Sequence, residues 1–556
     1  AGVAIEYRLN GRAFRIDFML SGRNLSGQES LVIIELKQWT DVALSDLSEH
    51  VRTVVGGNIR DLPHPSYQAW SYSSHLKMYN EYVYSNEVSV TACAYLHNCM
   101  DATVVNESRY EAKLREVPVF IKGQSSELRE LITRNISKGT GTALLERIDS
   151  AVVRPSKQLA EAVGSMLRGQ EEFVLLDEQK TVLEKIVKAS KDSVTGQKRV
   201  LIINGGPGTG KSVISINALA RLTGERLNAK YVTPNAAPRA VFESKLKKIF
   251  GKAEIKHLFS GSGSFTESES ESFDTLIVDE AHRLRMRSGM FKNLGESQVK
   301  EIINSAHTSV FFIDEAQKVT WSDVGEILMI EEVAKEAGAF VERFELTSQF
   351  RCGGSDDYIA WLDETLGIHA DVSHYFSTEK FDFQIFDSPV AMHEIIKEKN
   401  KENNKSRVVA GYCWDWISKD KPNLSDISIP EFGYKATWNL TSDGGEWIIS
   451  PHSVEEVGCI HTCQGLEVDY VGVIIGPDLI ARNGVLRTDP LGRAKTDKSL
   501  AGFKKEFKED PIKAELKADE LIRNTYRTLL SRGMKGCYVY FTDAETAQYF
   551  RDHLPS

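Results

Sequence analysis

The hydrophobic positions between residues 173 and 545 form short apolar runs, and each run is followed by a stretch with helical spacing. A strand that is covered on both faces has such a continuous run, whereas a half-exposed strand alternates. Strands that alternate with helices are typical of a parallel sheet with helices on both faces. The pattern predicts two α/β domains, with strands at 200–204, 230–233, 275–279, 310–314 and 343–346 in the first and at 406–412, 470–475 and 537–541 in the second.

The first hundred residues have a different pattern, in which β-rich runs alternate with turns. Runs at 14–20, 31–36 and 88–96 predict strands, and residues 67–82 predict a helix between the last two. The stretch that follows is charged and helical. We therefore expect an α/β protein in four parts, with a first domain at 1–125, a helical connector at 126–172 and two parallel-sheet domains at 173–345 and 346–556.

Length and composition fit a multidomain globular protein. A chain of 556 residues is too long for one core, and 41% hydrophobic with 26% charged residues is ordinary. No apolar stretch could cross a bilayer, and the N-terminus lacks the basic segment of a signal peptide. The seven cysteines form no C-x-x-C pair, which argues against zinc ribbons and iron–sulfur clusters. We expect a cytoplasmic protein without a membrane partner. Its net charge of −10 means that nucleic acid would need a local basic channel.

The most informative segment joins an apolar strand to a glycine-rich turn and then to a helix. Its sequence, G-G-P-G-T-G-K-S, has the spacing of a phosphate-binding loop, in which glycines let backbone N–H groups turn toward phosphate oxygens. Lys211 is expected to reach the β- and γ-phosphates, and Ser212 to ligate Mg²⁺. The loop predicts that ATP is bound by Gly205, Gly206, Pro207, Gly208, Thr209, Gly210, Lys211 and Ser212.

An acidic pair ends the strand predicted at 275–279. Asp279 can hold Mg²⁺ opposite Ser212, and Glu280 can polarise the attacking water. The sequence D-E-A-H is a weak signal alone, but here it follows a phosphate loop and ends an apolar strand. We therefore expect Asp279 at the metal and Glu280 as the catalytic base.

Further motifs occur in an order that resembles a superfamily 1 helicase. They are L-D-E-Q at 176–179, T-P-N-A-A-P-R at 233–239, F-I-D-E-A-Q at 312–317, L-T-S-Q-F-R at 346–351, H-T-C-Q-G-L-E at 461–467 and Y-R-T-L-L-S-R-G at 526–533. The third motif has Ile313 where glycine is usual. The resemblance implies two RecA-like motor domains that hydrolyse ATP with Mg²⁺ and move along nucleic acid.

The same resemblance implies roles for single residues. Gln179 would read the adenine, Gln317 would sense the γ-phosphate, and two arginines, Arg351 and Arg532, would neutralise charge in the transition state. Glu467 would contact the nucleotide from the second motor domain. The residues implied to contact the nucleic-acid strand are Thr233, Asn235, Arg239, Thr462 and Gln464.

A narrower resemblance covers about 173–545. The strings V-A-G-Y-C-W at 409–414, E-V-G-C-I-H-T-C-Q-G at 456–465, Y-V-G-V-I-I-G-P at 470–477 and N-T-Y-R-T-L-L-S-R-G-M-K-G-C at 524–537 are similar to the bacterial Schlafen group 3-like helicases. This resemblance implies the same two motor domains and movement along nucleic acid. It does not decide between DNA and RNA.

The N-terminal domain carries a separate acidic constellation. Asp17 lies on one predicted strand, and Glu35 and Lys37 lie on the next. Side chains alternate along a strand, so Glu35 and Lys37 share a face. Two carboxylates on adjacent strands can hold Mg²⁺ or Mn²⁺, which activates a water molecule, while Lys37 orients the water or the phosphate.

This constellation resembles the PD-(D/E)xK nuclease superfamily. The downstream pair Gln68 and Tyr72 matches the Q-x-x-x-Y motif of its RecB-type branch, at helical i, i+4 spacing. Such nucleases carry a further acidic residue on a helix before the aspartate strand, whereas only Glu6 precedes Asp17. The metal set is therefore incomplete or extends beyond this chain. Exposed charges on a small sheet are the structural alternative.

Together these features predict a nuclease–helicase: a restriction-endonuclease-like domain followed by two RecA-like motor domains. DNA is expected as the partner ahead of RNA, and repair or defence against phage is the setting by analogy. Three alternatives stay open. In the first, the nuclease-like domain only binds nucleic acid or partners and does not cut. In the second, the chain is an NTP-driven switch that does not move along nucleic acid. In the third, the motor acts on RNA.

Overall fold

The computed structural model describes most of the chain. Two compact units divide it: unit 1 comprises Ala1–Asp192 with Leu346–Phe350, and unit 2 comprises Ser193–Glu345 with Arg351–Ser556. Each unit is described by itself. The described residues are 1–9, 14–151, 159–168, 173–194, 196–247, 250–288, 294–347, 356–368, 376, 381–419, 424–439, 444–463 and 467–554.

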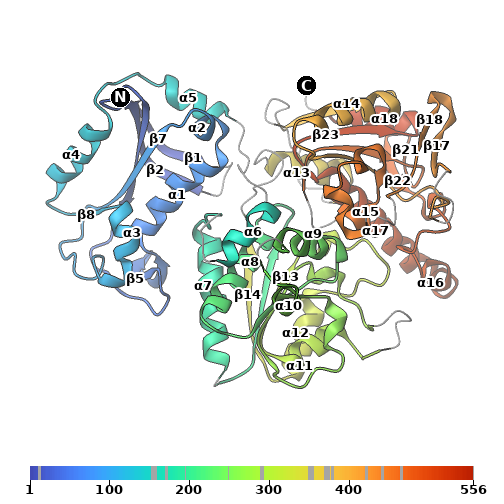
Figure 1. Cartoon of the computed structure of the whole chain (residues 1–556), viewed down its shortest axis with the longest axis horizontal. Helices are drawn as coiled ribbons and strands as arrows, with labels where there is room; N and C mark the ends of the chain where they lie inside the picture. Colours follow the sequence, from blue (N-terminus) through green and yellow to red (C-terminus); the bar gives the residue numbers. More distant parts are fainter. Residues whose placement is uncertain are drawn as a thin grey trace. The chain divides into compact units, whose positions relative to one another are not determined.

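Unit 1 is built on a mixed sheet with the strand order β1-β2-β3-β7-β8. Figure 1 labels β1, β2, β7 and β8 of this sheet. The first three strands pair antiparallel, and β7 and β8 continue the sheet in parallel with β3. A parallel pair needs a crossover connection, and the chain between β3 and β7 carries helix α1 (Pro65–Tyr79). The strands are β1 (Gly2–Leu9), β2 (Phe14–Arg23), β3 (Glu29–Lys37), β7 (Ser89–Leu96) and β8 (Val119–Ile121).

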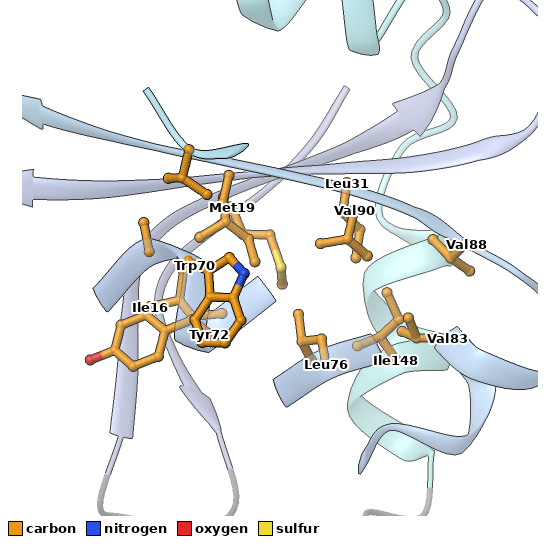
Figure 2. Packing of buried hydrophobic residues seen from close by; sticks show 14 of the residues in the cluster. Ile16, Met19, Leu31, Trp70, Tyr72, Leu76, Val83, Val88, Val90 and Ile148 are labelled. Carbon is orange, nitrogen blue, oxygen red and sulfur yellow. The ribbon is translucent and has the colours of Figure 1, made fainter. Parts of the chain in front are cut away.

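The main core of unit 1 lies between this sheet and α1. Figure 2 shows Met19, Leu31 and Val90 of the strands gathered with Trp70 and Leu76 of the helix. These side chains are almost completely buried, and burial of apolar area is the main favourable term in folding. The core therefore holds the Q-x-x-x-Y helix against the strands that carry the acidic constellation.

The alternation along β3 decides which side its polar residues occupy. Leu31 and Ile33 belong to the core on α1, whereas Val32 and Ile34 pack on the opposite face with helix α4 (Ser125–Asn135). Odd-numbered positions of β3 therefore point toward α1. Glu35 and Lys37 are odd-numbered residues of the same strand, so their side chains also lie on the α1 side of the sheet.

The rest of unit 1 surrounds this sheet. A small antiparallel sheet, β4-β5-β6, precedes α1, and the predicted helix at 67–82 is divided at Asn80, whose side chain caps α2 by accepting from the Val83 N–H at 3.1 Å. The remaining elements are β4 (Ala43–Leu44), β5 (His50–Val55), β6 (Asn58–Pro63), α2 (Glu81–Ser85), α3 (Glu111–Glu116), α4 (Ser125–Asn135), α5 (Ala143–Ser150), α6 (Leu159–Leu167) and α7 (Asp177–Ser193), which crosses the boundary between the units at its last residue.

Unit 2 contains two larger sheets. The first has the order β11-β10-β12-β13-β9-β14, and its β11, β10, β12, β13 and β9 pair in parallel. Four of its strands, β9, β10, β12 and β13, are mostly buried and agree with the continuous apolar runs predicted at 200–204, 230–233, 275–279 and 310–314, whereas β14 is mostly exposed or half-buried. They are β9 (Arg199–Gly205), β10 (Ala229–Val232), β11 (Phe259–Ser260), β12 (Phe273–Val278), β13 (Ala306–Ile313) and β14 (Phe340–Leu346).

The second sheet of unit 2 has the order β15-β23-β20-β16-β19 and is parallel throughout. The three strands predicted at 406–412, 470–475 and 537–541 are its central members. Its strands are β15 (Asp382–Phe386), β16 (Ser406–Ala410), β19 (Val457–Gly458), β20 (Val468–Ile475) and β23 (Gly533–Phe541). Two parallel sheets of this kind fit RecA-like motor domains, as the alternation of strands and helices predicts.

Helices and two hairpins complete unit 2. The helices are α8 (Lys211–Gly224), α9 (Ala236–Leu246), α10 (Lys252–Leu258), α11 (Gln298–Ser305), α12 (Ile327–Glu336), α13 (Asp356–Thr365), α14 (Pro389–Lys401), α15 (Ile460–Cys463), α16 (Phe503–Glu509), α17 (Pro511–Leu530) and α18 (Ala544–Asp552), and the hairpins are β17 (Ile427–Ile429) with β18 (Tyr434–Ala436) and β21 (Leu479–Arg482) with β22 (Val485–Thr488). In the part of the chain that the structure describes, none of the helices is both long and apolar enough to span a bilayer.

Candidate functional site

The phosphate loop turns between β9 and α8 in the conformation that its glycines permit. Gly208 and Gly210 have φ of 77° and 85°, in the left-handed region that residues with a Cβ avoid. The Lys211 Nζ donates to the carbonyl oxygens of Gly205 and Gly206, at 2.8 Å for Gly206. The ammonium group thus lies over the loop, where it can meet the phosphates of a nucleotide.

Asp279 follows β12 directly and lies beside the phosphate loop. Its Oδ2 accepts hydrogen bonds from the Ser212 Oγ at 2.6 Å and from the Tyr231 hydroxyl at 2.8 Å. Burial and the charge of Glu280 raise the pKa of Asp279. Mg²⁺ prefers oxygen ligands, and here a serine hydroxyl and a carboxylate lie side by side. Ser212 and Asp279 therefore fit the predicted metal role.

Glu280 is held in an unusual backbone conformation, with φ of 58°. Its Oε2 lies 3.2 Å from the His282 Nε2. Burial opposes ionisation, but the hydrogen bond and charge of His282 and the charges of Lys211 and Arg532 lower the pKa of Glu280 to about 2. An ionised carboxylate is the form that can accept a proton from an attacking water.

A second polar group joins the two sheets of unit 2. Asp314 follows β13, and its Oδ2 accepts from the Gln317 Nε2 at 2.7 Å and lies 4.0 Å from the Lys211 Nζ. The Gln317 Oε1 accepts from the Arg532 Nη2 at 3.3 Å. Arg532 is buried, with 2% of its surface exposed, and directly precedes β23 of the second sheet. The carboxyl edge of the first sheet and the amino edge of the second therefore supply one site.

Arg527 reinforces this junction from helix α17. Its guanidinium lies 3.9 Å from the Asp314 Oδ2 and makes two hydrogen bonds to Asp363, at 2.5 and 2.9 Å. A bidentate arginine–carboxylate pair fixes direction as well as distance. Arg527 therefore fixes α17, which ends just before Arg532, to Asp363 of α13 and places a positive charge near Asp314 of the first sheet.

The predicted nucleic-acid contacts lie on both sheet domains. Asn235 caps α9 by accepting from the Ala237 N–H at 3.4 Å, and the Thr233 Oγ1 accepts from the Asn235 N–H at 3.3 Å. Arg239 lies one turn along α9, 3.7 Å from Glu243. Thr462 lies on α15, where its Oγ1 donates to the Cys459 carbonyl at 2.8 Å.

The remaining predicted residues are Gln179, Glu467, Arg351 and Gln464. Gln179 is buried on α7 and belongs to unit 1, where its Oε1 accepts from the Leu176 N–H at 3.3 Å. Glu467 directly precedes β20. Arg351 and Gln464 lie outside the described residues. The roles of all these residues stay predictions.

The N-terminal constellation is assembled where β2 and β3 stop pairing. The Asp17 Oδ2 accepts from the Leu36 backbone N–H at 2.8 Å, just beyond the last paired residues, Phe18 and Ile34. The Lys37 Nζ donates to the Glu35 Oε1 at 2.6 Å. Sequence spacing and side-chain alternation predicted this proximity.

Glu35 sits in an environment that disfavours its charge. It is 2% exposed, and burial raises its pKa to about 7, with Asp17 and Asp177 adding to the rise and Lys37 opposing it. Its Oε2 is buried and receives no hydrogen bond from any described residue. A bound cation would satisfy that oxygen and relieve the repulsion.

Gln68 and Tyr72 meet on α1, and a third residue joins them. The Gln68 Nε2 donates to the Tyr72 hydroxyl at 2.9 Å, as their spacing predicts. Both groups also donate to the Oδ2 of Asp177, at 3.2 and 2.7 Å. Asp177 is the first residue of α7 and lies more than a hundred positions away in sequence.

The sequence analysis missed some residues around the phosphate loop and some in the N-terminal constellation. Tyr231 lies in no quoted motif, and nothing in its local sequence marks it. Asp177 lies within the quoted L-D-E-Q string at 176–179, but the sequence analysis gave it no role. Arg527 lies within the quoted Y-R-T-L-L-S-R-G string, so its place in a motif was a usable signal. Among the described residues, no group of three or more His, Cys, Asp or Glu side chains is arranged to hold a metal ion. A metal ion in the N-terminal pocket would therefore be held by a pair of carboxylates, such as those of Asp17 and Glu35.

The phosphate loop, the acidic pair and the arginine from a second parallel sheet define the class of nucleotide-driven motors with two RecA-like domains, to which helicases belong. Residues 198–543 match the family described as "Schlafen group 3, DNA/RNA helicase domain". Because this match covers more than half of the chain, the chain belongs to that family. It is accordingly a helicase-type protein that acts on nucleic acid, without distinction between DNA and RNA.

Similar proteins span much of the chain. A Saccharomyces cerevisiae protein named "Uncharacterized protein YPL245W" is 24% identical over 455 residues, which cover 73% of this chain and 97% of the yeast protein. Two solved helicase structures align at low similarity, with a TM-score of 0.27 each. Arterivirus nonstructural protein 10 in complex with DNA is 11% identical over 68% of each chain, and the Pyrococcus furiosus Hef helicase domain is 10% identical over 67% of this chain and 97% of its own. TM-scores this low do not establish a shared fold.

Proposed function

We propose that this protein hydrolyses ATP with Mg²⁺ to move along nucleic acid, with DNA as the first expected substrate. The observation that carries the proposal is the hydrogen bond between Arg532 and Gln317, because it brings an arginine of the second sheet to the site of Lys211 and Glu280 on the first. Charge on a transferring phosphoryl group is neutralised from both sheets only while they are together. Hydrolysis and product release would then be coupled to their separation, which is how a strand can be moved.

Each residue has a distinct part in this proposal. Lys211 binds the β- and γ-phosphates, Glu280 accepts the proton of the attacking water, and Arg532 stabilises the charge that develops on the γ-phosphate. Ser212 and Asp279 would hold Mg²⁺, which would neutralise part of the negative charge of the phosphates. Gln317 holds Arg532 toward Asp314 and Lys211.

The experiment that tests the motor is ATP turnover by the full chain with single-stranded DNA, single-stranded RNA or neither. A motor predicts turnover that rises on addition of a strand, and the larger stimulation identifies the preferred nucleic acid. Equal turnover in all three samples would contradict movement along nucleic acid and favour an NTP-driven switch. Larger stimulation by RNA would make the enzyme RNA-directed.

We further propose that unit 1 is a metal-dependent nuclease. Its support is the convergence of Asp17, Glu35 and Lys37 with Gln68 and Tyr72, and the buried Glu35 oxygen that a cation would satisfy. Asp17 and Glu35 would hold Mg²⁺ or Mn²⁺, which supplies an activated water. Lys37 would orient that water or the scissile phosphate. A nuclease coupled to a motor suits repair or defence against phage, and we propose those settings.

Lys37→Ala is expected to lower Mg²⁺-dependent cleavage of labelled DNA by about 10²-fold, the usual contribution of a positioned proton-transfer or charge-stabilising group. ATP turnover should stay unchanged, because Lys37 lies in the other unit. Lys122→Ala, at an exposed lysine of unit 1, is the matched control. Cleavage is followed on single- and double-stranded DNA in the same protein preparations used for ATP turnover.

Two results would contradict the nuclease. Wild-type protein that cuts no substrate with Mg²⁺ or Mn²⁺ would leave unit 1 as a domain that only binds nucleic acid or partners. Cleavage that persists in Lys37→Ala at the wild-type rate would indicate a contaminating enzyme or a different site.

A further inference from the structure

The hydrogen bonds to Asp177 resemble those of an anion-binding site in which the Asp177 carboxylate is the bound anion. Gln68 and Tyr72 extend from α1 and direct an N–H and an O–H to the same carboxylate oxygen, at 3.2 and 2.7 Å. Convergent donors on one anionic oxygen are typical of phosphate and carboxylate recognition. Burial raises the pKa of Asp177, and the hydrogen bonds from Tyr72 and Gln68 and the positive charge of Lys37 oppose that rise. The ligand in this site is a residue of the chain itself.

Asp177 is a poor permanent occupant of that site. It adds a third carboxylate to a pocket that already contains Asp17 and Glu35, and its charge is one of those that disfavour ionisation of Glu35. Its second oxygen, Oδ1, is buried and accepts no hydrogen bond from any described residue. A buried carboxylate oxygen without a donor costs free energy. An anion from outside with the same charge and no fixed backbone could therefore compete.

Helix α7 is anchored by other contacts, so Asp177 can leave without undocking the helix. Lys180 is buried between Glu49 and Glu184 and forms ion pairs with both. The Thr181 Oγ1 lies 3.2 Å from the His50 Nε2. These contacts lie one turn after Asp177. Displacement of its side chain is therefore a local event in the first turn, the turn that also contains Gln179.

We propose that Gln68, Tyr72 and Lys37 form a binding site for a backbone phosphate of a nucleic-acid strand, and that Asp177 occupies this site as an internal competitor until a strand enters. The identity of the ligand rests on the proposed nuclease function of unit 1. A phosphodiester carries one negative charge and accepts through its unesterified oxygens, as a carboxylate does. Strand entry exchanges one anion for another at the same donors and withdraws Asp177 from Glu35.

The test is the affinity of the full chain for a fluorescein-labelled single-stranded oligonucleotide, measured by fluorescence anisotropy in EDTA without ATP. DNA and RNA versions are both used. Asp177→Ala is expected to bind three- to tenfold more tightly than the wild type, because the donors are free. Asp177→Asn keeps an acceptor but loses the charge and should show a smaller gain. Tyr72→Phe added to Asp177→Ala should remove most of the gain.

Glu127→Gln, at an exposed glutamate of α4 in unit 1, is the charge-matched control and should bind like the wild type. Unchanged or weaker binding by both Asp177 variants, with thermal melting like that of the wild type, would overturn the proposal. An equal gain in Glu127→Gln would also overturn it, by showing a general charge effect. Asp177→Asn answers the question if Asp177→Ala does not fold.

The binding assay contains no metal and requires no cleavage, so failure of the phosphate site and failure of the nuclease give different results. Tighter binding by Asp177→Ala together with no Mg²⁺-dependent cleavage by any variant would leave the phosphate site standing and remove the nuclease. Lys37-dependent cleavage together with unchanged binding by the Asp177 variants would do the reverse.

Discussion

Arg532→Ala is expected to lower ATP turnover by about 10³-fold or more, while ATP binding stays within a few fold of the wild type. An arginine that neutralises the γ-phosphate in the transition state typically contributes 10³- to 10⁵-fold. The Arg532 guanidinium donates a hydrogen bond to Gln317, and its charge helps to lower the pKa of Glu280. The backbone of Arg532, however, directly precedes β23 of the second sheet. Turnover is measured at saturating ATP, and binding is measured separately with a fluorescent ATP analogue.

The matched control is Arg551→Ala, which removes an arginine of the same domain that pairs with Asp387 on the surface. It should leave turnover unchanged, because an exposed ion pair contributes little. Arg532→Lys keeps the charge but loses the forked donor geometry, and we expect it to recover only a small part of the activity. Turnover by Arg532→Ala at the wild-type rate would move the arginine role elsewhere, with Arg351 as the next residue to test.

Glu280→Gln is expected to lower ATP turnover by about 10²- to 10⁴-fold, which is the usual contribution of a positioned general base. Glutamine keeps the size of the side chain and the contact with His282 but cannot accept the proton. Because the phosphate contacts come from Lys211 and the loop, ATP should still bind. The protein would then hold ATP without hydrolysing it, which is measured as stoichiometric retention of labelled ATP after gel filtration.

Glu332→Gln, at an exposed glutamate of α12 on the same domain, controls for the loss of one negative charge and should hydrolyse ATP normally. Normal turnover by Glu280→Gln would show that another group activates the water. Loss of ATP binding by Glu280→Gln would show that the change disturbs the loop, and the role assigned to Glu280 would then be untested by this variant.

The local parts of the site were predictable because their geometry is fixed by neighbours in sequence. Lys211 follows glycines whose left-handed φ only glycine adopts readily, and Glu35 and Lys37 share a face because strand side chains alternate. The hydrogen bond between Gln68 and Tyr72 follows from their i, i+4 spacing on one helix. Each of these relations spans fewer than about five residues.

The parallel sheets were predictable for a related reason. A strand covered on both faces must be apolar throughout, so burial is written into the composition of each run. The order of the strands cannot be predicted in this way, because β9 lies beside β13 although β10, β11 and β12 come between them in the sequence. That order brings Gly205 and Asp314 to adjacent strand ends, and no local pattern contains it.

The sequence by itself determined the strands, the phosphate loop, the acidic pairs and the faces on which Glu35 and Lys37 lie, because each depends on short-range backbone geometry and on the need to bury apolar side chains. Only the tertiary structure decided that Arg532 meets Gln317 and that Asp177 meets Gln68 and Tyr72. Those contacts join residues more than a hundred positions apart, and chain packing, which sums many weak apolar contacts, selects them. Asp177 lies within the L-D-E-Q string, but nothing in that string indicates that Gln68 and Tyr72 donate to its carboxylate.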